Sequence, residues 1–215
     1  MKRLTILFFI LICVTNSFAQ NEKEAYIKVI TERSNKLVAA LKLDNQAKAE
    51  KVSVIVRDQY SNLNDIYTTR DSNLKAIKEK YTDKAERDAA IAKETAAVEE
   101  QTNKLHKDYL KKLAKQLNAQ QIDGVKDGMT YGVLPLTYKA YQEQILTLSE
   151  EQKNQILIWL TEAREKAMDA ESSDKKHAMF GKYKGRINNY LSAAGYDLKK
   201  EGIEWQKRIK AAKAN

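Results

Sequence analysis

The chain has few of the residues that interrupt regular structure. Among its 215 residues it holds one proline, Pro135, and seven glycines, all of which lie between Gly124 and Gly202. Glycine and proline are the strongest breakers of helices and strands. The first 123 residues therefore contain only helix-compatible sequence. We predict an all-α protein, a helical bundle body with a long, protruding, antiparallel hairpin of the coiled-coil type.

Long hydrophobic runs are absent except for one at the start of the chain. Lys2 and Arg3 precede an apolar run from Leu4 to Val14, and the small-x-small site Ser17-Phe18-Ala19 follows it. This is the pattern of a secretory signal peptide. The run is shorter than the about 20 residues that span a bilayer. We predict a signal peptide over residues 1–19, export to the periplasm or cell surface, and no transmembrane segment after cleavage.

Residues for covalent and metal chemistry are equally scarce. The only cysteine, Cys13, lies in the signal peptide, so the mature chain has neither disulfides nor a thiol nucleophile. Glu171, Asp174 and His177 are spaced by three and could form a metal cluster, or Asp174 could cap a helix. Zinc motifs, nucleophile elbows, phosphate loops and dinucleotide fingerprints are all missing. The sequence thus predicts no catalytic residue, no metal and no cofactor.

The formal net charge is +9, from 38 basic and 29 acidic residues. Lysines alternate with acidic residues along the expected helices, which is typical of a solvated surface. With export, this pattern argues against a nucleic-acid partner. Attraction to anionic polysaccharides or lipid headgroups stays open.

The first half of the chain predicts a helix over residues 25–41 and then two long helices. We expect Asp44 and Asp83 to cap the two long helices. Their apolar seams alternate steps of four and three residues, as in coiled coils. The seams are Leu63, Tyr67, Arg70, Leu74, Ile77 and Tyr81, then Ile91, Thr95, Val98, Thr102, Leu105 and Tyr109. Within a single domain over 20–215, residues from about 60 to 110 should project as a hairpin.

Residues 116–215 form the glycine-containing helical body. A short helix is expected over 116–126, followed by irregular structure over 127–132 and an extended or turned segment around Pro135. Ser149 and Gln152 predict a capping box. Gly195 should end a helix that starts near residue 175, and a last amphipathic helix covers 198–212.

The helix over 175–194 carries the first group of candidate binding residues. Opposite its apolar stripe lie Lys182, Arg186 and Asn189. These donors could contact sugar hydroxyls or carboxylates, or they could tie down neighbouring loops. Gly185 lies on the same face and costs about 1 kcal/mol relative to alanine. Its presence predicts that a ligand or another helix approaches closely.

The segment after Asp123 carries the second group. It offers Asp127, Thr130, Tyr131, Tyr138 and Tyr141 near two glycines. Loops often carry function, although the tyrosines could instead seal the core. We expect this loop and the Arg186 face to form one polar patch.

Several runs resemble the DUF3826 family of exported Bacteroidetes proteins. They include Asp127-Gly128-Met129-Thr130-Tyr131-Gly132, Glu162-Ala163-Arg164-Glu165, and Phe180-Gly181-Lys182-Tyr183-Lys184-Gly185-Arg186. The resemblance covers most of the mature chain. It implies a sugar-binding role in glycan use but supplies no catalytic residues.

The preferred function is therefore non-catalytic binding of carbohydrate, with an acidic sugar as the candidate ligand. The main alternative is a periplasmic helical chaperone or adaptor that holds other envelope proteins through the hairpin. Leu148-Ser149-Glu150-Glu151-Gln152 resembles the Leu-Thr-x-x-Gln motif of such chaperones. A polysaccharide hydrolase or lyase is a third alternative.

Overall fold

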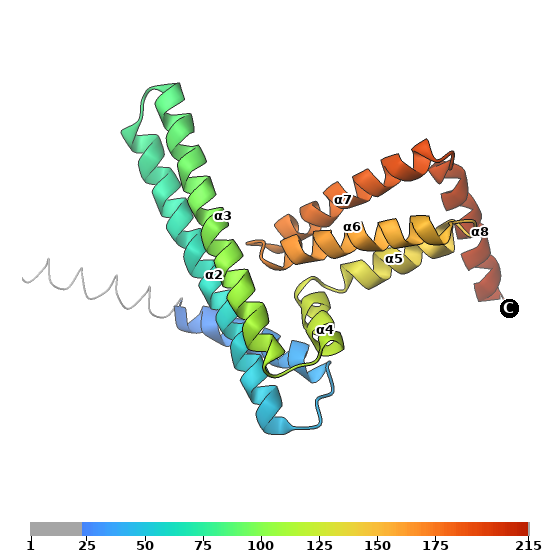
Figure 1. Cartoon of the computed structure of the whole chain (residues 1–215), viewed down its shortest axis with the longest axis horizontal. Coiled ribbons are helices and arrows are strands. Elements are labelled where there is room, and N and C mark those ends of the chain that lie inside the picture. Colours follow the sequence, from blue (N-terminus) through green and yellow to red (C-terminus); the bar gives the residue numbers. More distant parts are fainter. Residues whose placement is uncertain (1–22, 215) are drawn as a thin grey trace, which may run out of the picture. The chain divides into compact units, whose positions relative to one another are not determined.

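The computed structural model describes residues 23–214, so the predicted signal peptide lies outside the described residues. Throughout this range every regular element is a helix, which confirms the all-α prediction (Figure 1). A helix over 23–39 is followed by α2 (Gln46–Lys80), α3 (Lys84–Ala114), α4 (Ala119–Met129), α5 (Val133–Gln144), α6 (Glu150–Met168), α7 (Ser173–Ala193) and α8 (Leu198–Ala214). None of these described helices is long and apolar enough to cross a membrane.

The chain forms two compact units that meet in sequence between Asn118 and Ala119. The N-terminal unit contains the predicted antiparallel hairpin, in which α2 and α3 lie side by side (Figure 1). As predicted, Asp83 caps α3, its carboxylate accepting the Glu86 N–H at 2.9 Å. The prediction for α2 was wrong by one residue, because Asn45 rather than Asp44 accepts the Lys48 N–H at 2.8 Å.

Burial in the N-terminal unit is confined to one end of the hairpin. Ile30 and Val38 of the first helix are buried, as are Val52 of α2 and Leu113 of α3. The Tyr26 hydroxyl donates to the Tyr60 carbonyl at 3.2 Å, which joins the first helix to α2. From residue 64 to residue 108 no side chain is buried, and only a half-buried seam joins the two arms.

The α3 seam differs from the predicted one at a single position. Thr95 is exposed, and its hydroxyl donates to the Ile91 carbonyl of its own helix at 2.8 Å. Glu94 is half-buried instead and accepts a hydrogen bond from Asn73 of α2 at 2.9 Å. Residue 95 fits the alternation of four and three better than residue 94 does, so the contact with Asn73 across the hairpin overrides the spacing here.

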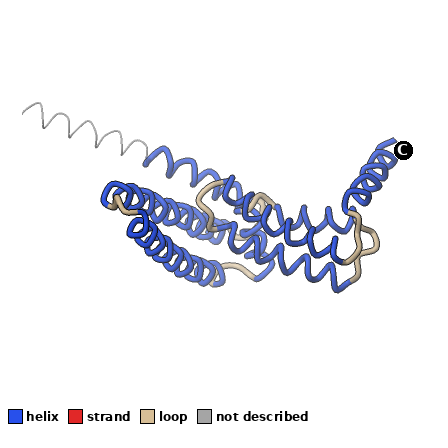
Figure 2. Tube along the Cα trace, turned by 90° about the horizontal axis from the view of Figure 1, so that it is seen from above, coloured by secondary structure: helices blue, strands red, loops and turns tan. Residues whose placement is uncertain are grey.

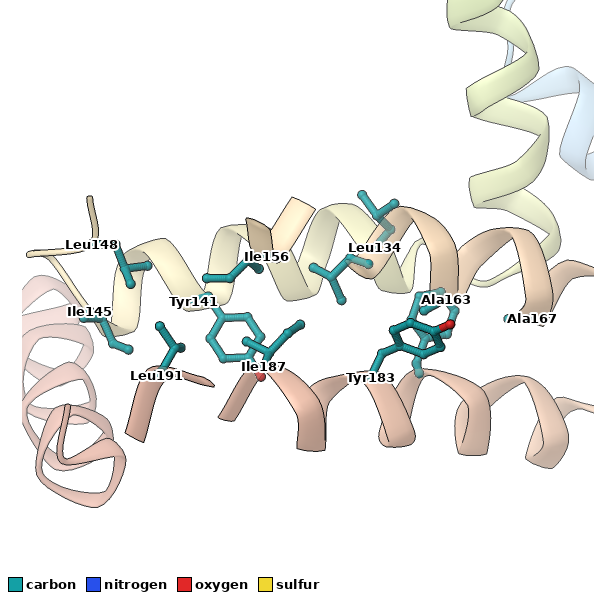
Figure 3. Close-up of a cluster of buried hydrophobic side chains, with 12 residues drawn as sticks. Leu134, Tyr141, Ile145, Leu148, Ile156, Ala163, Ala167, Tyr183, Ile187 and Leu191 are labelled. Carbon is teal, nitrogen blue, oxygen red and sulfur yellow. The ribbon is translucent and has the colours of Figure 1, made fainter. Parts of the chain in front are cut away.

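In the C-terminal unit, α5 and α7 both pack on α6. Figure 2 shows the chain from above, with the helices in blue and the loops that connect them in tan. Figure 3 shows the side chains that point into the space between these helices. The buried cluster comprises Leu134, Tyr141, Ile145, Leu148, Ile156, Leu160, Ala163, Ala167, Phe180, Tyr183, Ile187 and Leu191. It contains Phe180, Tyr183, Ile187 and Leu191 of the apolar stripe predicted for α7. Of the other two residues predicted there, Tyr190 packs against the cluster and Ala194 is exposed.

Two predicted helix ends are confirmed. The Ser149 hydroxyl accepts the Gln152 N–H while the Gln152 side chain accepts the Ser149 N–H, which completes the capping box at α6. Gly195 follows α7 with φ +94°. The Tyr196 N–H donates to the Leu191 carbonyl at 3.1 Å, as in a Schellman motif.

The predicted irregular segment around Pro135 is wrong, because Pro135 lies in the first turn of α5. The first four N–H groups of a helix have no partner within it, so a proline there loses no hydrogen bond. Likewise α4 continues to Met129 and includes Asp127. The true turn is short: Tyr131 and Gly132 adopt left-handed φ values of +59° and +66°.

Lys176 closes the C-terminal end of α6. It is 6% exposed, and its ammonium donates to the carbonyls of Ala167 at 3.1 Å and Met168 at 2.7 Å. These are carbonyls that the last turn of a helix leaves without intrahelical partners.

Lys176→Met should lower the free energy of unfolding by about 2 kcal/mol, because the Met168 carbonyl loses its donor, whereas the Ala167 carbonyl keeps the Ala170 N–H at 3.1 Å. The exposed neighbour variant Lys175→Met should change it by less than about 0.5 kcal/mol. Urea unfolding followed by tryptophan fluorescence measures this, since Trp159 and Trp205, the only tryptophans, lie in the C-terminal unit. Equal effects of the two variants would contradict a capping role.

Candidate functional site

The candidate residues lie around α7, which buries a stripe of four side chains in the core cluster that it shares with α5 and α6. The stripe is Phe180, Tyr183, Ile187 and Leu191. A helix that buries one stripe presents two flanks, one on each side of it. The flank toward α5 and the flank toward α6 carry different polar residues. The structure therefore divides the patch that we expected to be continuous.

Asp127 does not face a ligand surface but anchors α4 to α6. Its carboxylate accepts a hydrogen bond from Arg164 at 2.8 Å, and Asp123 accepts a second from the same guanidinium at 2.6 Å. Arg164 is only 7% exposed. Burial lowers its pKa, but the bonds and charges of the two aspartates outweigh burial, so the net pKa is raised. Asp127 is thus engaged within the C-terminal unit.

The short turn places Thr130 inside and Tyr131 outside. Thr130 is buried, and its hydroxyl donates to the Lys126 carbonyl at 2.8 Å. Tyr131 is exposed and stacks on His177 at the start of α7, with ring centroids 5.5 Å apart. The loop therefore meets α7 at His177, nine positions before Arg186, so these two predicted regions are not brought together.

The other two tyrosines of the group belong to α5. Tyr138 packs against the core cluster, and Tyr141 is part of it (Figure 3). The Tyr141 hydroxyl donates to the Asn188 side-chain oxygen at 2.7 Å and lies 3.4 Å from the Lys184 carbonyl. Tyr141 thus joins α5 to the flank of α7 that faces it.

Arg186 lies on the opposite flank, against α6. Its guanidinium lies over the Trp159 ring, 4.5 Å from the ring centroid, and the ring of Tyr190 meets Trp159 edge-on at 5.3 Å. Arg186 is 56% exposed, and its nearest carboxylate oxygen, on Glu162, is 4.0 Å away. That distance is too long for a hydrogen bond. The guanidinium lies over the indole ring while its N–H groups remain available.

Glu162 has stronger partners than Arg186. Hydrogen bonds from Tyr183 and then Lys166 lower the pKa of Glu162, and its oxygen lies 3.0 Å from the Lys166 ammonium. Burial raises the pKa of Tyr183, with a further contribution from its hydrogen bond to Glu162. Tyr183 thus remains a neutral donor at ordinary pH, and Glu162 remains an anion beside Arg186.

Lys182 and Asn189 are exposed on the outer side of α7, as predicted. Gly181 and Gly185 lie between the two flanks, and a Cβ built on either meets nothing within 4 Å. Neither glycine is required by packing among the described residues. The close approach predicted at Gly185 is not made by another helix of the C-terminal unit.

The α5 flank forms a groove that the sequence did not predict as a site. It has a cavity volume of about 550 Å³ and is bounded by α5, α7 and the first turn of α8. Its polar lining is Thr137, Tyr141, Gln144, Lys184, Asn188 and Lys199. Of these only Tyr141 was a candidate residue. The others come from three helices, and no spacing along the chain connects them.

Within residues 23–214 no group of three or more His, Cys, Asp or Glu side chains could hold a metal ion. His177 stacks on Tyr131 instead of joining Glu171 and Asp174 in a cluster. The α7 cap is Ser172, whose hydroxyl accepts the Lys175 N–H at 3.2 Å, and not Asp174.

Fold and surface together define an all-α protein whose polar and aromatic residues gather on two flanks of one helix. A profile of the family described as protein of unknown function DUF3826 matches residues 27–211. The chain belongs to this family, which confirms the resemblance noted from its motifs. Comparison with curated proteins gives no match.

Substitution by alanine should change the free energy of unfolding in opposite directions at Gly185 and at Gly195. Gly185→Ala should raise the free energy of unfolding by about 0.5–1 kcal/mol, because the helix interior favours alanine and no atom obstructs the new Cβ. Gly195→Ala should lower it by about 1 kcal/mol, because its φ is +94°. Urea unfolding by tryptophan fluorescence compares the two. A destabilised Gly185→Ala would show that a packing constraint exists there.

Tyr141 should make the protein sensitive to alkali. Burial raises its pKa to about 12, against 10.0 for an unperturbed tyrosine. As the pH rises from 10 toward 12, the unfolded chain ionises first, so stability present below pH 10 is lost, by about 2–3 kcal/mol at most. Tyr141→Phe should flatten this loss in urea unfolding at about pH 9 and about pH 11. If Tyr141→Phe loses as much stability at high pH as the wild-type protein does, another ionisable group causes the loss.

Proposed function

We propose that this protein is an exported, non-catalytic carbohydrate-binding accessory of glycan utilisation. The observation that carries the proposal is the Arg186 guanidinium, held over Trp159 at 4.5 Å with no hydrogen-bond partner among the described residues. The contact with Trp159 restricts the Arg186 side chain before a ligand arrives. Less conformational entropy is then lost when the N–H groups bind a ligand oxygen.

The neighbours of Arg186 suit a ligand rich in hydroxyls. Arg186 supplies donors, while the ionised Glu162 supplies acceptor oxygens 4.0 Å away. Adjacent sugar hydroxyls both donate and accept hydrogen bonds, so such a pair can engage two of them. The half-buried Trp159 offers apolar area next to this pair. Lys182 and Asn189 add exposed donors on the same helix.

Export and a place in the periplasm or on the cell surface are part of this proposal. They rest on the signal pattern of residues 1–19 and the absence of cysteine from the mature sequence. A role in glycan use is what the resemblance of the sequence to this family implied. The ligand includes glycans with acidic units, since the chain has a formal net charge of +9.

Isothermal titration against neutral and uronate-containing oligosaccharides tests the proposal. Arg186→Ala should weaken binding of a responding glycan at least tenfold, about 1.4 kcal/mol. Arg186→Lys should lose most of the same affinity, because an ammonium lacks the planar set of donors. Trp159→Phe should give an intermediate loss, because a smaller ring supports the guanidinium less well.

Arg87→Ala is the matched control, since Arg87 is a half-buried arginine of α3 in the other unit. It should leave glycan affinity unchanged. If the wild-type protein binds none of the oligosaccharides in the panel, carbohydrate binding is refuted. Equal losses in Arg186→Ala and Arg87→Ala would show that net charge, and not this surface, attracts the glycan.

The hairpin favours a second candidate function, a helical chaperone or adaptor for envelope proteins. Its arms bury no side chain between residues 64 and 108, so their half-buried seam and flanks are open to a partner. In this case the protein would suppress aggregation of an unfolded client, and deletion of residues 67–105 would abolish the effect. Full suppression by the deletion variant would exclude the hairpin as the binding element.

A further inference from the structure

The groove on the α5 flank of α7 differs in charge from the surface around Arg186. Its two ionisable cations are Lys184 of α7 and Lys199 of α8, and no carboxylate lines it. Neither lysine forms an ion pair with a carboxylate of residues 23–214. The Asp197 carboxylate, which is close in sequence, accepts the backbone N–H groups of Lys199 and Lys200 at 3.1 and 3.0 Å. The groove is therefore an uncompensated cationic cavity.

The walls of the groove are fixed by hydrogen bonds that also orient its amide groups. Tyr141 donates to the Asn188 side-chain oxygen at 2.7 Å, which leaves the Asn188 amino group as a donor. The Gln144 amino group donates to the Leu198 carbonyl at 3.2 Å, which leaves its oxygen as an acceptor. Gly202 of α8 lies near the same glutamine, since a Cβ built on it would be 3.4 Å from the Gln144 amide nitrogen.

Size and apolar lining narrow the choice of ligand. About 550 Å³ lies within the range of small-molecule sites, which is about 300–1,000 Å³. Leu136, 67% exposed, and Leu198 add apolar surface to the lining. A ligand that fits has an anionic group for the lysines, hydroxyls for the amides and a C–H surface for the leucines. A sugar ring bearing a carboxylate has all three.

We propose that this groove binds the carboxylate-bearing unit of an acidic glycan. The inference rests on the proposed carbohydrate-binding function. It assigns the preference for acidic glycans to the groove, away from Arg186. The α6 flank has an anion, Glu162, next to its arginine, whereas the α5 flank has only cations. Neutral hydroxyls are bound at the first surface, and the groove selects for the acidic unit.

The test uses tetragalacturonate and its fully methyl-esterified form, which share one backbone and differ in charge. Wild-type protein should bind the acid form at least tenfold more tightly than the ester at low salt. The double variant Lys184→Gln/Lys199→Gln should lower affinity for the acid form about tenfold and leave affinity for the ester unchanged. Both lysines are at the surface of the unit, and thermal unfolding verifies that the variant is folded.

The matched control is Lys175→Gln/Lys200→Gln, which removes the same charge from exposed positions of α7 and α8 outside the groove. It should keep the preference for the acid form. Equal affinity of wild-type protein for both forms overturns the inference alone if Arg186 is still required for binding. Equal losses in the two double variants also overturn it, because general attraction would then suffice. Failure to bind either form refutes the proposed function together with the inference.

Discussion

The packing of α5 and α7 on α6 is the constraint on which the C-terminal unit depends. Phe180, Tyr183, Ile187 and Leu191 occupy one stripe of α7 and are buried in the cluster that these helices share. Because an α-helix turns every 3.6 residues, burying this stripe places the adjacent positions on two separate flanks. Arg186 and Asn188 are two residues apart in sequence, yet they face different helices. The fold therefore places polar residues that are close in sequence on two separate surfaces.

The two flanks differ in what their neighbours contribute. Helix α6 brings Trp159 and Glu162 to Arg186, so that flank combines an aromatic ring with charges of both signs. Helices α5 and α8 bring amides and one more lysine to Lys184, so that flank is cationic. Whether the positive charge of a flank is compensated by a carboxylate depends on the neighbouring helix, and not on α7 itself. On this difference rests the proposal that one flank contacts sugar hydroxyls and the other a carboxylate.

Stability in the N-terminal unit is unevenly distributed along the hairpin. The end near Val52 and Leu113 has a buried core completed by the first helix, whereas residues 64–108 bury no side chain. Helix stability in water comes mainly from packing of an apolar face. The distal arms should therefore open more readily than the end that carries the core, as is common for regions that contact partners.

Much of the local structure could be predicted from the sequence. Asp83, Ser149 and Gly195 act at helix ends through bonds that span a few residues, so their identity and spacing suffice. The apolar stripe of α7 was also readable, because its period is that of the helix. Pro135 was misjudged since the first helical turn tolerates proline, and the start of α5 depends on a turn in which Tyr131 adopts an unusual backbone conformation.

The site could be predicted only in part. That Arg186, Lys182 and Asn189 would be exposed followed from the position of the buried stripe. That Asp127 would be engaged by Arg164, and that Trp159 would support Arg186, involves residues about 27 to 37 positions apart. The sequence alone determined helix type, helix ends and the buried face of each helix, because those depend on near neighbours. Only the tertiary structure decided which side chains meet, because helix packing brings together residues that no periodicity connects.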